Sequence, residues 1–118
     1  MINLNIDGLN INYLDFGNKK GDAIVLLHGW GQNISMMQML GEPFKDKYRI
    51  IVVDFPGFGG SDEPKEVMGV DGYTKIIEKL LKKLNVKNPI LIGHSFGGRV
   101  SVKFASRNDV KKLILLSP

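Results

Sequence analysis

Apolar and polar residues alternate at the start of the chain and then give way to short, continuous apolar runs. Residues Ile2–Ile6 and Asn10–Phe16 alternate with a period of two and are separated by the sequence DGL, a strong hairpin signal. Continuous apolar runs are typical of strands buried on both faces of a parallel sheet. Four such runs follow: Ala23–His28, Arg49–Asp54, Pro89–His94 and Lys111–Pro118. The pattern predicts an antiparallel hairpin followed by four parallel strands.

The segments between these runs carry helical periodicity. Apolar residues within Tyr73–Leu84 recur at helical spacing and leave the charged residues on the opposite side. Asp71 is expected to be the N-cap of this helix. Two further helices are expected, Asn33–Gly41 and Phe96–Arg107. Strands that alternate with helices predict an α/β fold with a mostly parallel sheet and right-handed crossovers, in one domain over residues 1–118.

Composition narrows the class of protein. The 118 residues are 43% hydrophobic and 24% charged, which is typical of a globular domain with a buried core. The net charge of +4 comes from lysines spread along the chain without interleaved aromatic residues, so no nucleic-acid partner is expected. The absence of cysteine excludes disulfides and thiolate metal sites. Because the sequence has no signal-peptide pattern and no apolar run of roughly 18 residues, we expect a cytoplasmic protein without a membrane partner.

Glycine-rich segments follow three of the apolar runs, at the edge of a parallel sheet where ligands bind. They read HGWG at His28–Gly31, DFPGFGGSD at Asp54–Asp62 and GHSFGG at Gly93–Gly98. In the third segment a strand passes directly into a helix, so the chain must turn sharply at Ser95 with a strained backbone. Such a turn raises the Ser95 hydroxyl above the sheet, at the positive end of the following helix. Ser95 is therefore a candidate nucleophile.

Two backbone amides are candidates for an oxyanion hole beside this serine. The N–H of Phe96 follows Ser95 directly and is expected to point into the same space. The HGWG segment is a flexible turn after a neighbouring strand, and the N–H of Trp30 is the candidate second donor. The indole of Trp30 either walls the substrate site or only packs, and both alternatives stay open.

These three segments together resemble those of the α/β-hydrolase family, which includes carboxylesterases, lactonases, serine-type haloperoxidases and carbon–carbon hydrolases. A lone GxSxG is weak evidence, but three motifs in the same order cover the chain from Ile2 to Pro118. The resemblance implies that Ser95 is the nucleophile and that the amides of Trp30 and Phe96 form the oxyanion hole. It further implies a small ester or related carbonyl substrate, an acyl-enzyme, and neither metal nor cofactor. Serine at this position disfavours haloalkane dehalogenases and epoxide hydrolases, which use aspartate.

Other polar residues of these segments are expected to be structural. His94 lies on the strand side of the turn, so its ring should point away from the Ser95 hydroxyl. The resemblance gives His28 a role in holding the loop conformation. It places Asp54 at the head of a loop, where the carboxylate accepts backbone N–H bonds rather than serving as the triad acid. Arg99 is expected to be an ion-pair partner rather than a substrate clamp.

The sequence offers no general base for this serine. A serine hydrolase needs a base and an acid that orients it, and in this family the chain order is serine, acid, histidine. After Ser95 there is no histidine, and the one acid, Asp109, is expected at the amino end of a strand, on the wrong side of the sheet. The resemblance places the lid, acid and histidine after Lys111–Pro118. We therefore expect the amino-terminal half of a hydrolase, from a truncated gene, a fragment or a split protein, that is inactive alone.

A non-catalytic role is the alternative. The run Leu113–Leu116 is expected to form an unprotected apolar edge strand, which favours pairing with another chain. The partner would be a second copy of the chain or a complementing carboxy-terminal segment. On this alternative the chain is a binding or interaction module that retains the hydrolase half-fold.

Overall fold

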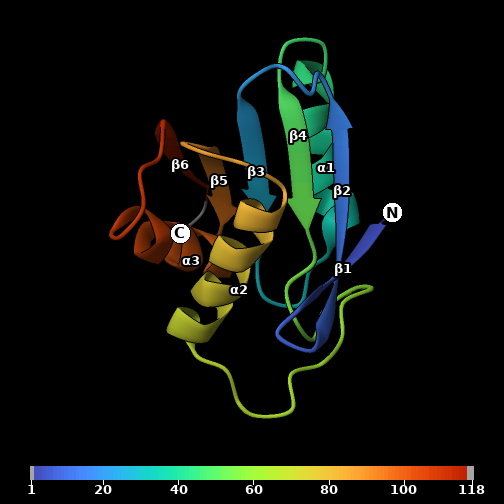
Figure 1. Cartoon of the computed structure of the whole chain (residues 1–118), viewed down its shortest axis with the longest axis vertical. Coiled ribbons are helices and arrows are strands. Elements are labelled where there is room, and N and C mark those ends of the chain that lie inside the picture. The colour runs from blue at the N-terminus through green and yellow to red at the C-terminus, as the bar shows by residue number, and fades with distance from the viewer. Residues whose placement is uncertain (1, 117–118) are drawn as a thin grey trace.

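The computed structural model describes residues 2–116, which form one mixed sheet with helices on both faces (Figure 1). The strands are β1 (Ile2–Ile6), β2 (Leu9–Gly17), β3 (Ala23–Leu27), β4 (Arg49–Val53), β5 (Ile90–His94) and β6 (Lys112–Leu116). Their order across the sheet is β1-β2-β4-β3-β5-β6. The strand predicted over Lys111–Pro118 is β6, which begins one residue later than predicted, at Lys112. The last two residues of the predicted strand lie outside the described part of the chain.

The pairing of the strands confirms the predicted hairpin and parallel core. β1 pairs antiparallel with β2 through a turn in which Asp7 and Gly8 both have positive φ, 53° and 86°. β2 in turn pairs antiparallel with β4. From there the sheet is parallel, with β3 between β4 and β5, and β6 beyond β5.

The helices are α1 (Ile34–Gly41), α2 (Val70–Lys83) and α3 (Phe96–Ala105), with a short 3-10 turn, η1 (Glu42–Phe44), after α1. The side chain of Asn33 caps α1 by accepting a hydrogen bond from the N–H of Ser35. The prediction that Asp71 caps α2 is wrong, because the helix already begins at Val70 and Gly69 is its N-cap. Asp71 lies in the first turn instead, where a carboxylate also favours the helix dipole. Within residues 2–116, no helix is both long and apolar enough to cross a bilayer.

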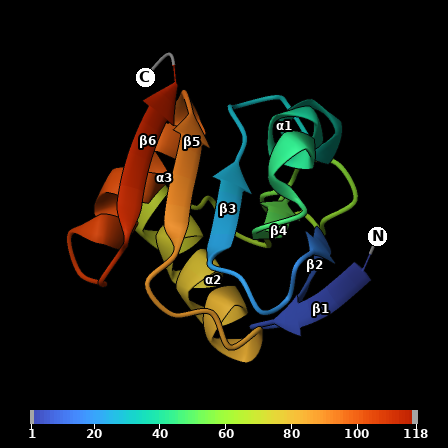
Figure 2. The same ribbon diagram turned by 90° about the horizontal axis from the view of Figure 1, so that it is seen from above.

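The helices pack on opposite faces of the sheet and give a three-layer α/β/α arrangement. Figures 1 and 2 show α2 and α3 together on one face and α1 on the other. Alternate residues of each strand point to the two faces, so β3 sends Val25 and Leu27 toward α2 and α3, and Ile24 and Leu26 toward α1. All five residues of β3 are buried, as the continuous apolar run predicts.

The parallel pairing brings three loops to one edge of the sheet. Leu27 of β3 is in register with Val53 of β4 and Gly93 of β5, so these strands end at the same level. The glycine-rich segments begin at or directly after those residues. The fold therefore gathers the three segments singled out in the sequence at the carboxyl edge of the sheet.

Candidate active site

Ser95 occupies a strained turn between β5 and α3. Its backbone angles are φ 53° and ψ −111°, a conformation that an L-residue rarely adopts. The glycines beside it make the turn possible, because a Cβ on Gly97 would lie 2.1 Å from the carbonyl oxygen of Leu27. A Cβ on Gly93 would lie 2.6 Å from the Cα of Gly98. The sharp turn predicted from the sequence is therefore confirmed, and Ser95 is exposed at its tip.

Backbone hydrogen bonds hold this turn on both sides. The N–H of Ser95 donates to the carbonyl of Leu116 at 3.0 Å, which ties the turn to the end of β6. The carbonyl of Ser95 accepts from the N–H groups of Gly98 and Arg99, at 2.9 and 3.3 Å, and so starts α3. The position of the serine is thus fixed by the sheet and by the helix, without a side-chain cap.

An open pocket of about 360 Å³ lies over the serine and is lined by Trp30, Ser95, Phe96 and Arg99. The indole of Trp30 is 62% exposed and meets the ring of Phe96 edge to face, with ring centroids 5.0 Å apart. Trp30 also contacts Phe58 in the same manner, at 4.9 Å. The indole therefore packs against both rings and also lines the pocket, and its role as a wall of a substrate site stays a prediction.

His28 lies beneath the loop that carries Trp30. It is fully buried, its Nδ1 lies 2.6 Å from the carbonyl oxygen of Gly29, and its Nε2 accepts a hydrogen bond from the N–H of Phe55 at 3.0 Å. This pattern requires a neutral ring protonated on Nδ1, and burial lowers the pKa of His28 below its ordinary value. The expected role in holding the loop is consistent with these contacts.

The hydrogen bond from His28 also orients the next peptide group. The carbonyl of Gly29 and the N–H of Trp30 belong to one trans peptide, so they point in opposite directions. A carbonyl held by the histidine below therefore aims the Trp30 N–H away from His28. The side chain of Gln32 fixes the preceding peptide, because its Oε1 accepts from the N–H of Gly29 at 3.0 Å. Gln32 is not among the residues predicted from the sequence, since no pattern there signals its role.

Asp54 organises the loop after β4. Its Oδ1 accepts from the N–H of Ile34, the first residue of α1, at 2.7 Å. Its Oδ2 accepts from the N–H of Gly60 and from Nδ2 of Asn12, both at 2.9 Å. The prediction that this carboxylate accepts backbone N–H bonds is confirmed. Because both oxygens are already engaged and the side chain is buried, Asp54 is poorly placed to orient a catalytic base.

Two further residues attach the same loop to β2. The hydroxyl of Ser61 donates to the carbonyl of Asp54 at 2.6 Å and accepts from the N–H of Asn12 at 2.8 Å. The carboxylate of Asp62 accepts from the N–H of Asn10 at 2.8 Å. These contacts extend the edge of the sheet into the loop and support the floor of the site.

His94 is the last residue of β5, on the strand side of the turn at Ser95. A Cβ on Gly29 would lie 2.9 Å from Nδ1 of His94, so the ring packs against the backbone of the HGWG segment. That nitrogen is buried and has no hydrogen-bond partner among the described residues. A side chain at position 29 would therefore require the His94 ring to shift, and the structural role of His94 stays a prediction.

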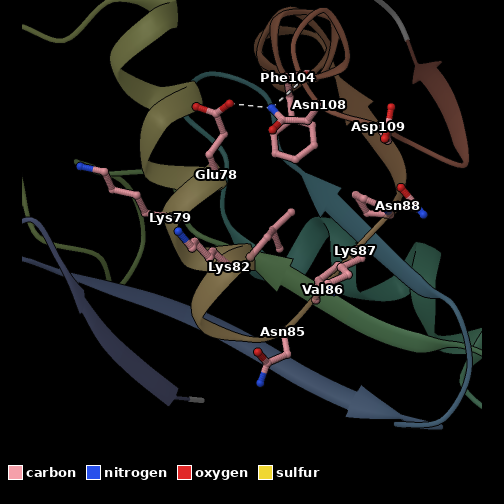
Figure 3. Close-up of a pocket in the computed structure, with 12 residues that line it drawn as sticks. Glu78, Lys79, Lys82, Asn85, Val86, Lys87, Asn88, Phe104, Asn108 and Asp109 are labelled. Carbon is pink, nitrogen blue, oxygen red and sulfur yellow. Dashed lines mark hydrogen bonds between the residues drawn. The ribbon is translucent and has the colours of Figure 1, made fainter.

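The one acid after Ser95 lies far from the serine. Asp109 is exposed and lines a surface hollow of about 770 Å³, together with residues that precede β5 (Figure 3). Those residues include Asn88 and Pro89, so this hollow lies at the amino ends of the strands. Asp109 therefore lies on the wrong side of the sheet, as predicted from its place in the sequence.

The expectation that Arg99 is a structural ion-pair partner is not met among the residues that the structure describes. Its side chain is exposed and forms no ion pair with any residue between positions 2 and 116. The carboxylates of α2 reach Arg107 instead, where Glu78 and Asp71 both bind the guanidinium. Arg99 is left facing the pocket over Ser95.

Known proteins are similar to this chain in sequence and in fold. The chain is 38% identical over 101 residues to the AB hydrolase superfamily protein YisY of Bacillus subtilis, a match that covers 82% of this chain and 38% of that protein. It is 29% identical over 109 residues to epoxide hydrolase 3 of Xenopus tropicalis, a match that covers 91% of this chain and 30% of that protein. The esterase from Exiguobacterium antarcticum superposes with a TM-score of 0.85 at 32% identity, over 93% of this chain and 42% of that one.

The chain thus spans less than half the length of each of these three proteins. Residues 22–118 match the model of the alpha/beta hydrolase fold family, and this range includes all three glycine-rich segments. The strand order, the turn at Ser95 and this match lead to one conclusion: the chain belongs to the α/β-hydrolase family.

Proposed function

We propose that this chain carries the nucleophile and oxyanion hole of a serine hydrolase that cleaves small esters or related carbonyl compounds. Ser95 attacks the carbonyl carbon, its hydroxyl proton passes to a general base, and the leaving group departs to give an acyl-enzyme. The amides of Trp30 and Phe96 donate hydrogen bonds to the oxyanion. Water then releases the acid product.

The observation that carries this proposal is the strained, exposed position of Ser95. A serine needed only for packing would not require positive φ with close-packed glycines on both sides. The conformation instead presents the hydroxyl to the pocket, at the N-terminus of α3. Serine, rather than the aspartate expected of epoxide hydrolases, favours ester chemistry over epoxide opening.

The oxyanion hole rests on two amides. Phe96 is the first residue of α3, and the first N–H groups of a helix have no partner within the helix. The N–H of Trp30 is directed by the bond between His28 and the Gly29 carbonyl, described above. Removing one such donor typically lowers kcat on the order of 10²-fold to 10³-fold.

The base and its acid come from outside these 118 residues on this proposal. The two histidines of the chain are His28, which is buried and engaged, and His94, which packs against the loop. Asp54 is committed to backbone N–H groups, and Asp109 is at the other end of the strands. A further segment of the same protein, or a second chain, would place a histidine over Ser95.

An assay of the 118-residue chain with p-nitrophenyl acetate tests whether the chain holds the nucleophile but not the general base. Without a base, acyl transfer to Ser95 is slow and deacylation is slower, so we expect a slow release of p-nitrophenol that is measurable above background but does not exceed one equivalent. Ser95→Ala should remove that release, whereas Ser106→Ala, at an exposed serine beyond the end of α3, should not. Rapid, serine-dependent turnover by the isolated chain would contradict the proposal that the base lies elsewhere.

A second candidate function is binding through β6. This strand lies at the edge of the described sheet, pairs only with β5 there, and exposes Leu115. A second copy or a complementing carboxy-terminal segment would pair along it. Sedimentation of the chain over a range of concentrations tests self-association, and Leu115→Lys should abolish it without changing the helical content. A chain that stays monomeric at every concentration would leave only the complementing segment as partner.

A further inference from the structure

The three arginines of the chain are used in two different ways. Arg49 binds the carboxylate of Asp15 with two nitrogens, at 3.0 and 2.6 Å. Arg107 binds two carboxylates of α2. Arg99 alone has no carboxylate partner within residues 2–116. Its guanidinium keeps its full capacity for bidentate hydrogen bonding to a carboxylate.

Arg99 lies one helical turn after Ser95. The N–H of Arg99 donates to the carbonyl of Ser95 at 3.3 Å, which is the hydrogen bond of a single α-helical turn. Residues four apart lie on the same side of a helix, and both of these line the pocket. The other two lining residues, Trp30 and Phe96, are aromatic, and none of the four is acidic.

We propose that Arg99 binds a carboxylate on the substrate, and that the enzyme prefers esters whose acyl or alcohol part ends in an anionic group. This inference rests on the proposed function, because it places the reacting carbonyl at Ser95. The aromatic rings of Trp30 and Phe96 pack against the apolar spacer between the two ends of the substrate. The guanidinium then selects the charged end, since it matches a carboxylate in geometry and charge.

The position of Trp30 allows this proposal to be tested by binding alone. It is the single tryptophan of the chain, it is exposed, and it lines the pocket, so its fluorescence and its indole N–H resonance both report on occupancy. The probes are monomethyl glutarate, which carries one ester and one carboxylate, and dimethyl glutarate, which carries two esters. The two differ by one methyl group and one charge.

We expect the 118-residue chain to bind the monoester at least about tenfold more tightly than the diester in low salt, with the preference falling as salt is added. Arg99→Gln should remove the preference, and Arg99→Lys should keep part of it, because lysine retains the charge without the bidentate geometry. Lys103→Gln is the matched control, since it removes one positive charge from an exposed site on the same helix, outside the pocket.

Equal affinity for the two probes would overturn the inference, and so would a preference that survives Arg99→Gln or disappears in Lys103→Gln. Ser95→Ala separates this inference from the proposed function. The variant should keep the monoester preference, because binding by Arg99 does not require the nucleophile. A Ser95 that proves unreactive while the preference persists would contradict the proposed function and leave the carboxylate site standing.

Discussion

The Nε2 atom of His28 accepts a hydrogen bond from the backbone N–H of Phe55, 3.0 Å away. This bond joins the loop after β3 to the loop after β4, and the other ring nitrogen holds the carbonyl of Gly29. A single buried ring therefore sets the relative position of two of the three loops that form the site. The histidine of the elbow, His94, makes no comparable bond through its buried nitrogen among the described residues.

Replacing His28 with alanine should destabilise the fold, because the ring joins the loop that carries Trp30 to the loop after β4. The change leaves a cavity and a buried Phe55 N–H without a partner, so the free energy of unfolding should fall by about 2–4 kcal/mol. Urea unfolding measures this loss. A change under about 0.5 kcal/mol would show that the ring does not join the two loops.

The same ring should make stability depend on pH. Burial lowers the pKa of His28, so the folded protein holds it neutral while the unfolded chain protonates it below about pH 6.5. Below that pH the unfolded state binds more protons, and the free energy of unfolding falls as pH falls. We expect the stability advantage of the native chain over His28→Gln to be largest above about pH 6.5 and to narrow between about pH 6.5 and 5. An advantage that stays constant over this range would contradict the assignment of a neutral, buried ring.

Asp54→Asn should lower the free energy of unfolding, although asparagine has nearly the same shape as aspartate. An amide nitrogen would replace one of the two carboxylate oxygens. In one orientation it would face the N–H of Ile34, and in the other it would face the N–H of Gly60 and Nδ2 of Asn12, so donor would meet donor in both. We therefore expect the free energy of unfolding to fall by about 2–4 kcal/mol. Asp62→Asn is the matched control, because that exposed side chain accepts from one N–H and asparagine can still do so. Equal effects of the two substitutions in urea unfolding would contradict the central role of Asp54.

The two glycines that open α3 should respond differently to alanine. A Cβ on Gly97 would lie 2.1 Å from a backbone oxygen of β3 that cannot move away, so Gly97→Ala should cost more than about 3 kcal/mol or prevent folding. A Cβ on Gly98 would have its nearest contact at 3.5 Å, and alanine favours a helix, so Gly98→Ala should change stability by less than about 1 kcal/mol. Thermal unfolding compares the stability of the two variants. Similar melting temperatures would contradict the close packing of Gly97 at the turn beside Ser95.

Features that depend on neighbouring residues could be predicted from the sequence. The buried strand β3 follows from an uninterrupted apolar run, and the turn at Ser95 follows from a strand that meets a helix between glycines. The hairpin at Asp7 and Gly8 is equally local. The parallel order of the strands then places the three loops at one edge without further information.

Features that depend on distant partners could not be predicted in this way. Whether Arg99 or Arg107 pairs with α2 depends on how α2 and α3 cross, and it is Arg107 that meets the carboxylates of that helix. The contacts of Asn12 with the loop after β4 join residues more than forty positions apart, so no local pattern indicates them.

The start of α2 shows how a local preference can mislead. Aspartate favours the N-cap position, so Asp71 is the residue that local preference selects. The helix nevertheless begins at Val70, directly after its N-cap Gly69, and the N–H of Tyr73 donates to the carbonyl of Gly69 at 3.1 Å. The Asp71 carboxylate therefore binds Arg107 across the contact between α2 and α3. As an N-cap, the same carboxylate would instead accept a hydrogen bond from the backbone of its own helix.

The most direct test of the central claim is to map where the 118-residue chain is acetylated by p-nitrophenyl acetate, using peptide mass spectrometry. The turn presents the Ser95 hydroxyl beside two amide donors for the oxyanion, so even slow acylation should reach Ser95 well before Ser35 and Ser106, which are also exposed. Ser95→Ala should leave only slow, scattered modification. Equal acetylation of the three serines, or none at Ser95, would contradict the claim that this turn is built to present a nucleophile.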